Sequence, residues 1–181
     1  MKGPRTLETA RLVLRKPTLQ DGQAIFERYA GDPIVTRYMS WPTHRTIADT
    51  HAFLAWSEGD WELWPAGSYL IYSRNTNGLL LGGTGLTFRT PLLAVTGYVL
   101  AQDAWGQGFA TESLGAMVEL ARQTGVKRLE AECHADHRAS AHVLEKCGFQ
   151  CEGVSPAHTE FPNLALGCRC DVLSYSMRFK A

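Results

Sequence analysis

Charge imbalance and long apolar runs are both missing from this sequence, and each absence excludes a class of protein. Lys plus Arg and Asp plus Glu both number 18, so the formal net charge is +0. A balanced chain has no general electrostatic attraction for nucleic acid or for an anionic membrane. No apolar stretch approaches the roughly 20 residues of a membrane span, and the first residues show no signal-peptide pattern. We therefore predict a protein without nucleic-acid or membrane partners.

Paired cysteine motifs are also missing. The chain has 5 cysteines, an odd number, and none of them forms a CxxC pair. Zinc sites usually need such pairs, so we predict no metal, although Cys168 and Cys170 lie close together in sequence. Without an export signal, the cysteines are expected to be reduced thiols in the cytoplasm.

Repeats, linkers and low-complexity tracts are absent as well, which leaves an ordinary globular chain. Its 181 residues are 45% hydrophobic and 20% charged, enough for a sizeable core. We predict a single domain over residues 1–181.

Hydrophobic periodicity predicts strands and helices in an irregular order. A helix is expected to follow Thr18, which has Asp21 three residues later as a capping partner, and Asn77-Gly78 is typical of a hairpin turn. Further helices are expected at 46–59, 111–122 and 136–147, and strands at 11–16, 67–73, 79–88, 94–100, 126–134, 149–154 and 169–179. This order predicts an α+β fold with one mixed sheet.

The stretch from 94 to 125 is the centre of this arrangement. It contains a strand, then the loop Trp105-Gly106-Gln107-Gly108-Phe109-Ala110, then a helix. Glycines before a helix expose free N–H groups at the positive end of the helix dipole, which favours phosphate oxygens. The loop has neither the GxGxxG nor the GxxxxGK[ST] spacing, so a dinucleotide fold and a P-loop are not indicated.

Four segments carry a resemblance to a known family. They are LETARLVLRKPTLQD, TRYMSWP, GYVLAQDAWGQGFATE and ASAHVLEKCGF, and they span nearly the whole chain in order. Together they resemble the GNAT superfamily of acyl-CoA-dependent N-acetyltransferases, within it the branch of ribosomal-protein N-terminal acetyltransferases. The resemblance implies a mostly antiparallel sheet flanked by about four helices, with a splayed central strand pair forming a coenzyme A cleft.

The resemblance also implies how acetyl-CoA is bound. The backbone of the central strand would pair with the pantetheine arm like an added strand, and the N–H of Val99 would polarise the acetyl carbonyl. The remaining contacts would come from the glycine loop and the last helix. The implied cofactor residues are Tyr98, Val99, Leu100, Trp105, Gly106, Gln107, Gly108, Phe109, Ala110, Thr111, His137, Ser140 and Lys146.

Three positions depart from the family pattern. Trp105 stands where Arg or Gln is usual, which this branch tolerates. His137 replaces the Asn that bonds the pantetheine amides, and imidazole cannot donate and accept as an amide does. Thr96 replaces a Glu that often precedes Gly-Tyr, so that candidate base is missing.

Amine acetylation needs a base for the amine and an acid for the departing thiolate. Ser140 is the candidate acid, with the alternative that it only bonds the start of its helix; Tyr98 is a second acid candidate or a core residue. The base is left open between His134, His137 and Glu112, and Glu112 could instead complement the helix dipole.

The acceptor site is expected in the aromatic first half of the chain, with Tyr38, Trp41 and His134 as substrate-binding residues. Aromatic faces attract ammonium groups, although the same residues could be core. The sequence thus predicts acetyl transfer to a protein N-terminus or a small amine, by a monomer or homodimer. The alternative is a CoA-binding or sensing module with weak catalysis.

Overall fold

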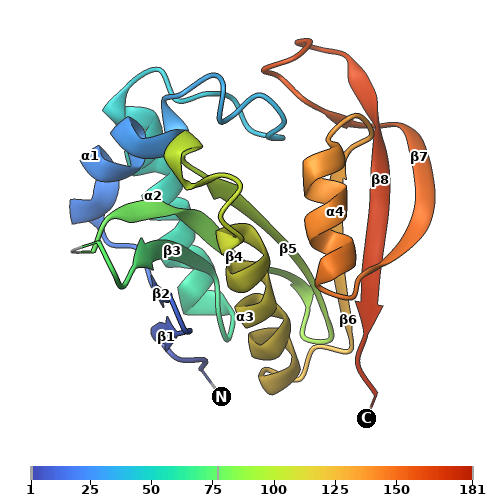
Figure 1. Cartoon of the computed structure of the whole chain (residues 1–181), viewed down its shortest axis with the longest axis horizontal. Helices are drawn as coiled ribbons and strands as arrows, with labels where there is room; N and C mark the ends of the chain where they lie inside the picture. Colours follow the sequence, from blue (N-terminus) through green and yellow to red (C-terminus); the bar gives the residue numbers. More distant parts are fainter. Residues whose placement is uncertain (1, 77, 181) are drawn as a thin grey trace.

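A single eight-stranded sheet runs through the computed structural model, which describes residues 2–76 and 78–180 (Figure 1). The strand order is β1-β2-β3-β4-β5-β6-β8-β7, and every neighbouring pair is antiparallel except β5 and β6. The predicted α+β fold with a mixed sheet is confirmed. The strands are β1 (Thr6–Glu8), β2 (Leu12–Arg15), β3 (Ser68–Ser73), β4 (Leu80–Thr90), β5 (Leu93–Leu100), β6 (Arg128–His134), β7 (Gln150–Glu160) and β8 (Arg169–Arg178).

Helices cover both faces of the sheet. Successive residues of a strand point to opposite faces, and Leu70 and Ile71 of β3 accordingly enter two separate hydrophobic clusters. The larger cluster contains Ile71 together with Leu114 and Met117 of α3, and the smaller one contains Leu70 together with Leu54 of α2. Within the described residues the α-helices are α1 (Gly22–Ile25), α2 (Ile47–Leu63), α3 (Phe109–Gln123) and α4 (Arg138–Lys146).

The segment after Thr18 differs from the single helix that its pattern predicts. The capping pair forms as expected, because the Thr18 side chain and the Asp21 carboxylate each bond the other's backbone. The chain then continues as a 3-10 turn (Leu19–Asp21), one turn of α1, and a π-helical turn (Phe26–Ala30) that ends where the Gly31 N–H donates to the Phe26 carbonyl. The wider last turn places Tyr29 and Ala30 in the smaller cluster.

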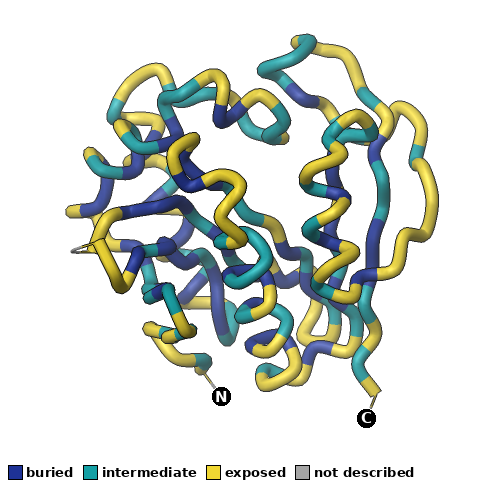
Figure 2. Tube along the Cα trace, viewed as in Figure 1, coloured by how far each residue is buried: buried dark blue, intermediate teal, exposed yellow. Residues whose placement is uncertain are grey.

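Two strands also differ from the expected ones. β1 has only three residues, too few for an alternating pattern, and the sequence did not indicate it. β7 runs to Glu160 rather than ending near Val154, because a register shift between Ser155 and Thr159 accommodates Pro156. Figure 2 shows that β7 forms a largely exposed edge of the sheet. Asn77 of the predicted hairpin turn lies outside the described residues.

The parallel pair at the centre of the sheet separates along its length. β5 and β6, both described in full, pair at Leu93–Val95 and Arg128–Glu130, and their later residues pair only with their outer neighbours. Figure 1 shows the two strands diverging, with α3 beside β5 and α4 beside β6. This is the predicted splayed pair, and it positions the candidate site.

Candidate active site

The two edges of β5 carry different backbone groups. Ala101 donates its N–H to the Leu81 carbonyl at 2.8 Å, and the register with β4 is regular from Leu100 back to Ala94. In antiparallel strands the direction of the N–H alternates, so Val99 faces β4. The tight packing at Gly82 agrees, because a Cβ there would lie 2.0 Å from the Val99 carbonyl oxygen. This register turns the Val99 N–H towards β4 and does not favour the prediction that it polarises the acetyl carbonyl, although Val99 lines the cavity.

The backbone N–H groups of Tyr98 and Leu100 point to the opposite edge, where β6 has moved away. By the same alternation these two donors face the gap between the strands. The Leu100 carbonyl accepts a 2.8 Å bond from the Trp105 indole N–H. The Trp105 side chain thus bonds the backbone of β5 at Leu100. The backbone groups of Tyr98 face the gap, where an extended ligand can pair with them.

Where the strands separate, the side chains of Tyr98 and Ser140 meet. The Tyr98 hydroxyl donates to Ser140 Oγ at 3.2 Å, which joins β5 to the first turn of α4. Both residues line a cavity of about 720 Å³ that extends from the splayed strands to the loops above α2. A serine hydroxyl has one proton and two acceptor positions, so Ser140 still has its own proton to donate into the cavity.

Tyr98 and Cys133, two titratable groups beside Ser140, are neutral at physiological pH. Burial raises the pKa of Tyr98 to about 12, and the bond to Ser140 only partly offsets that effect. Burial likewise raises the pKa of Cys133, which lines the same cavity, to about 11. The site can therefore supply protons, and it holds no thiolate that would compete with an incoming nucleophile.

The glycine loop leads directly into α3. Gly106 and Gly108 have φ angles of 71° and 80°, which side chains rarely adopt, and Gly108 is the N-cap residue of the helix. Opposite the loop, the Arg28 guanidinium holds Asp103 through bonds of 2.8 and 3.0 Å. The Gln107 side chain bonds the Asp103 carbonyl at 2.6 Å. The loop is thus ordered, with the free N–H groups of the first helical turn at its end.

The Glu112 carboxylate, in the first turn of α3, is fully engaged in hydrogen bonds with the segment before β2. Its carboxylate accepts bonds from the Thr9 hydroxyl (2.6 Å), the Arg11 N–H (2.8 Å) and Arg11 Nε (2.7 Å). Burial opposes its ionisation, but these bonds hold the pKa of Glu112 below its ordinary value. Glu112 is not among the described residues that line the cavity, so its bonds favour a supporting role at the start of α3 over the predicted catalytic one.

The two candidate histidines differ in what they face. His134 accepts the Asp136 N–H at Nδ1 (3.1 Å) and packs its ring against Tyr38 and Phe161. The Nδ1 lone pair is therefore already engaged and is not available to an amine. His137 lines the cavity, and its ring stacks on Tyr38 with centroids 4.6 Å apart. Burial, and secondarily His134, lower the pKa of His137, so its ring is neutral at pH 7.

Some aromatic side chains of the first half of the chain line the cavity, and others pack in the core. Tyr38, Trp41 and Trp56 line the cavity together with Phe53 and His44. The Trp61 and Trp64 rings instead pack against Tyr69 and Phe88 in or beside the larger core cluster. The predicted substrate residues Tyr38 and Trp41 are thus in reach of a ligand, whereas His134 lies behind Tyr38.

Asn163, in the loop between β7 and β8, ties together the walls of the acceptor side. Its Oδ1 accepts bonds from the Thr43 N–H (2.8 Å) and hydroxyl (3.0 Å), and its Nδ2 donates to the Thr36 (2.7 Å) and Trp41 (2.9 Å) carbonyls. All four bonds fall on the loop that carries Tyr38 and Trp41. One side chain from the far half of the sheet therefore fixes the loop that lines the cavity.

Asn163→Ala is expected to raise the acceptor KM about tenfold and to leave the acetyl-CoA KM unchanged. Loss of bonds worth about 1 kcal/mol each lets the 36–43 loop move. Steady-state kinetics with each substrate varied in turn measures this split. Asn163→Asp keeps Oδ1 but replaces the donor by a second carboxylate oxygen that faces the Thr36 and Trp41 carbonyls, so its KM for the amine should be at least as high as that of Asn163→Ala. An unchanged KM for the amine in both variants would contradict this role of Asn163.

Sequence patterns had no means of finding Asn163, Phe161 or Arg11 as site residues. Asn163 follows a proline and reads as a turn residue, and Arg11 reads as the exposed side of a strand. The hydrogen-bond partners of Arg11 and Asn163 in the site lie 96 to 127 residues away in the chain. Such contacts come from the assembled sheet and not from any local spacing.

A splayed parallel pair with a free strand edge, a glycine loop at a helix start and a half-buried hydroxyl pair are the parts that an acyl-CoA-dependent acyltransferase needs. The chain meets this description in every part, and comparison with known sequences specifies the family. Residues 11–150 match the family model described as "Acetyltransferase (GNAT) domain". The chain belongs to the GNAT family of acetyltransferases, and acetyl-CoA is the cofactor of that family, as predicted.

Similar proteins agree with this assignment. The chain is 32% identical over 151 residues to the uncharacterized N-acetyltransferase YoaA of Bacillus subtilis, covering 82% of this chain and 84% of YoaA. Its fold matches that of the microcin C7 self-immunity acetyltransferase MccE, in complex with acetyl-CoA and AMP (TM-score 0.85, 21% identity, 98% of each chain). It also matches RimL, the ribosomal L7/L12 α-N-protein acetyltransferase, in complex with coenzyme A (TM-score 0.82, 22% identity, 96% of this chain and 97% of that one).

Residues 2–76 and 78–180 hold no group of three or more His, Cys, Asp or Glu side chains placed to bind a metal ion. Over the same residues, no helix has both the length and the apolar character to cross a membrane.

Proposed function

We propose that the chain acts as one catalytic domain that transfers acetyl from acetyl-CoA to a primary amine, by direct attack in a ternary complex. The observation that carries this proposal is the Tyr98–Ser140 hydroxyl pair, placed on the cavity wall at the point where β5 and β6 separate. It sets a proton donor between a free strand edge on one side and an aromatic cavity on the other.

The residues present fit acetyl-CoA. The Tyr98 and Leu100 N–H groups would pair with the pantetheine amides, and the loop from Trp105 to Thr111 would hold the pyrophosphate through its N–H groups. His137 lines the cavity beside the pantetheine position, and the exposed Lys146 would approach the adenosine phosphates. When bound, acetyl-CoA supplies an activated thioester; the protein supplies orientation and proton transfer.

Two proton transfers are assigned to residues of the cavity. Ser140 donates its proton to the leaving sulfur, while Tyr98 holds the Ser140 hydroxyl in the orientation that leaves this proton free. Among the base candidates, His137 alone combines a neutral ring with a place in the cavity lining. It would accept the proton of the amine. Thr96, in the position of the missing Glu, is engaged with the Gly85 carbonyl at 2.8 Å.

The acceptor is proposed to be a peptide N-terminus or a small amine with an apolar side chain. Several aromatic rings line the cavity, and such rings favour apolar groups and ammonium ions. RimL acts on a ribosomal-protein N-terminus, which makes peptides the first acceptors to screen. The five free thiols suit a reducing cytoplasm, where we expect a monomer or homodimer to act.

The test begins with a thermal shift in acetyl-CoA. Ligand at about 100 times its Kd should add roughly 2.7 kcal/mol, or several degrees in Tm for a domain of this size. Amines are then screened by release of free coenzyme A thiol. Binding with turnover supports the proposal, binding without turnover by any amine favours a CoA-sensing module, and no binding at millimolar acetyl-CoA overturns both.

A further inference from the structure

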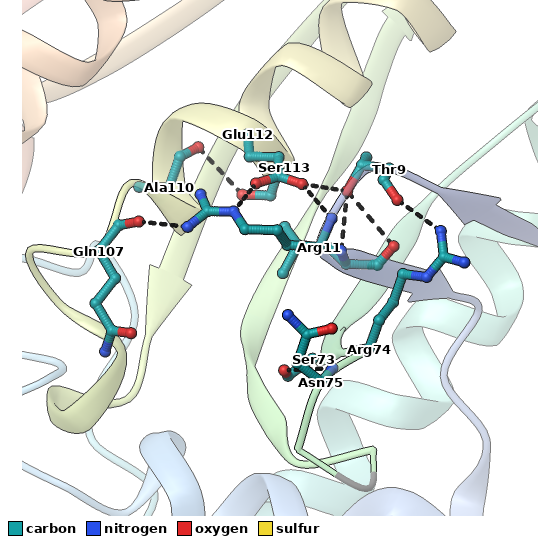
Figure 3. Close-up of polar contacts among 10 residues, drawn as sticks. Thr9, Arg11, Ser73, Arg74, Asn75, Gln107, Ala110, Glu112 and Ser113 are labelled. Atoms are coloured by element: carbon teal, nitrogen blue, oxygen red, sulfur yellow. Dashed lines mark hydrogen bonds and ion pairs between the residues drawn. The ribbon is translucent and has the colours of Figure 1, made fainter.

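Arg11 lies beside the glycine loop and the first turn of α3, and its side chain bonds Gln107 of the loop and Glu112 of the helix (Figure 3). Its Nη1 donates to the Gln107 carbonyl at 2.9 Å, and its Nε donates to Glu112 Oε2 at 2.7 Å. Its guanidinium lies 4.6 Å from the centre of the Phe109 ring. Arg11 precedes β2, almost 100 residues before the loop, so the sheet brings the two together.

The bond to Gln107 fixes the direction of one loop N–H. A trans peptide is planar, with its carbonyl and its N–H on opposite sides. Because the Gln107 carbonyl points to Arg11, the N–H of Gly108 in the same peptide points away from it. A Cβ at Gly108 would lie 3.3 Å from Arg11 Nη2, so glycine leaves room for the guanidinium, and its φ of 80° suits the N-cap position of α3.

Arg11 also balances the charge at the start of the helix. Glu112 lies in the first turn of α3, where an uncompensated carboxylate would repel an anionic ligand. Arg11 pairs with it through its backbone N–H and its guanidinium, and Thr9 adds a third bond. The pair leaves the helix dipole and the loop N–H groups available to an incoming phosphate.

We infer that Arg11 is a positioning residue for the diphosphate end of the cofactor, acting through the Gln107–Gly108 peptide and through Glu112. The inference rests on the proposed function, because it assumes that the loop binds the phosphates of acetyl-CoA. It goes further by assigning phosphate affinity to a residue of the β1–β2 hairpin that lies outside the loop itself.

The test compares Arg11→Met with Arg74→Met. Arg74 is a matched arginine on the neighbouring strand end: it bonds the Thr9 carbonyl and its side chain is 44% exposed, against 41% for Arg11. We expect Arg11→Met to raise the acetyl-CoA Kd at least tenfold by titration calorimetry, and Arg74→Met to change it less than twofold. Acetyl-pantetheine, which lacks the diphosphate, should bind both variants as it binds the unaltered protein.

A second pair of variants tests the charge argument and guards against misfolding. Arg11→Met/Glu112→Gln removes both charges and should recover part of the lost affinity, and Arg11→Lys should give an intermediate Kd. An unchanged acetyl-CoA Kd in a folded Arg11→Met variant would overturn the inference, and so would an equal loss for acetyl-pantetheine. Failure of the unaltered protein to bind acetyl-CoA would instead overturn the proposed function.

Discussion

Ser140→Ala is expected to lower kcat about 100-fold while leaving the acetyl-CoA Kd within about threefold of its original value. General acid catalysis contributes roughly this factor, and the loss falls on kcat because the proton is needed only as the sulfur departs. Tyr98→Phe should cost less, about tenfold, because it removes the hydroxyl that orients Ser140 and not the donor itself. Single-turnover and steady-state thiol release, together with calorimetry for binding, measure the two effects.

The control is another hydroxyl pair of the same kind. Ser155 and Ser174 lie with their Oγ atoms 3.0 Å apart on β7 and β8, away from the residues that line the cavity. Ser155→Ala should leave kcat unchanged. If Ser140→Ala kept kcat within twofold, Ser140 would be only a residue of the helix start, and the acid would have to be sought elsewhere.

The pH profile offers a further check on the same pair. Because burial raises the pKa of Tyr98 to about 12, its hydroxyl stays protonated below that value. Activity should rise as the amine acceptor loses its proton and then stay level through about pH 10, the ordinary pKa of tyrosine. A fall in kcat centred near about pH 10 or below would show that the Tyr98 proton is not held in this way.

Gly82→Ala is expected to destabilise the protein by roughly 3 kcal/mol or more. A Cβ at this position would lie 2.0 Å from the Val99 carbonyl oxygen and 2.9 Å from the Leu100 Cα. Both contacts are backbone, so the clash is relieved only by moving β4 from β5. At about 2–4 °C per kcal/mol, the loss in Tm should be roughly 6–12 °C.

Gly115→Ala is the matched control for this substitution. Gly115 is an exposed residue of α3, and a Cβ there would meet nothing within 4 Å. The change should raise stability by about 0.5–1 kcal/mol, because alanine suits a helix better. Thermal and denaturant unfolding measure both variants. A Tm for Gly82→Ala within 2 °C of the original would show that the β4–β5 contact is looser than described.

Most of the fold was predictable because its signals are local. Alternation and helical periodicity placed the main strands and helices, and the glycine loop indicated an anion site before any contact was known. The backbone direction of Val99 was not predictable, since it depends on the register with β4. Glu112 looked free in sequence because its partners, Thr9 and Arg11, are about 100 residues away. The π-helical turn at Phe26–Ala30 was not predictable for a similar reason, because its residues pack against β3 and β4, which come much later in the chain.

The short contact between β5 and β6 has a consequence for how the molecule opens. Three residue pairs join the β1–β5 part of the sheet to the β6–β8–β7 part, so this seam holds fewer hydrogen bonds than the pairs on either side. Local opening should follow the seam, and amides beside it should exchange with solvent sooner than those of β4 or β8. A ligand that contacts both strands would close the seam, and the slowing of that exchange would report occupancy without any turnover.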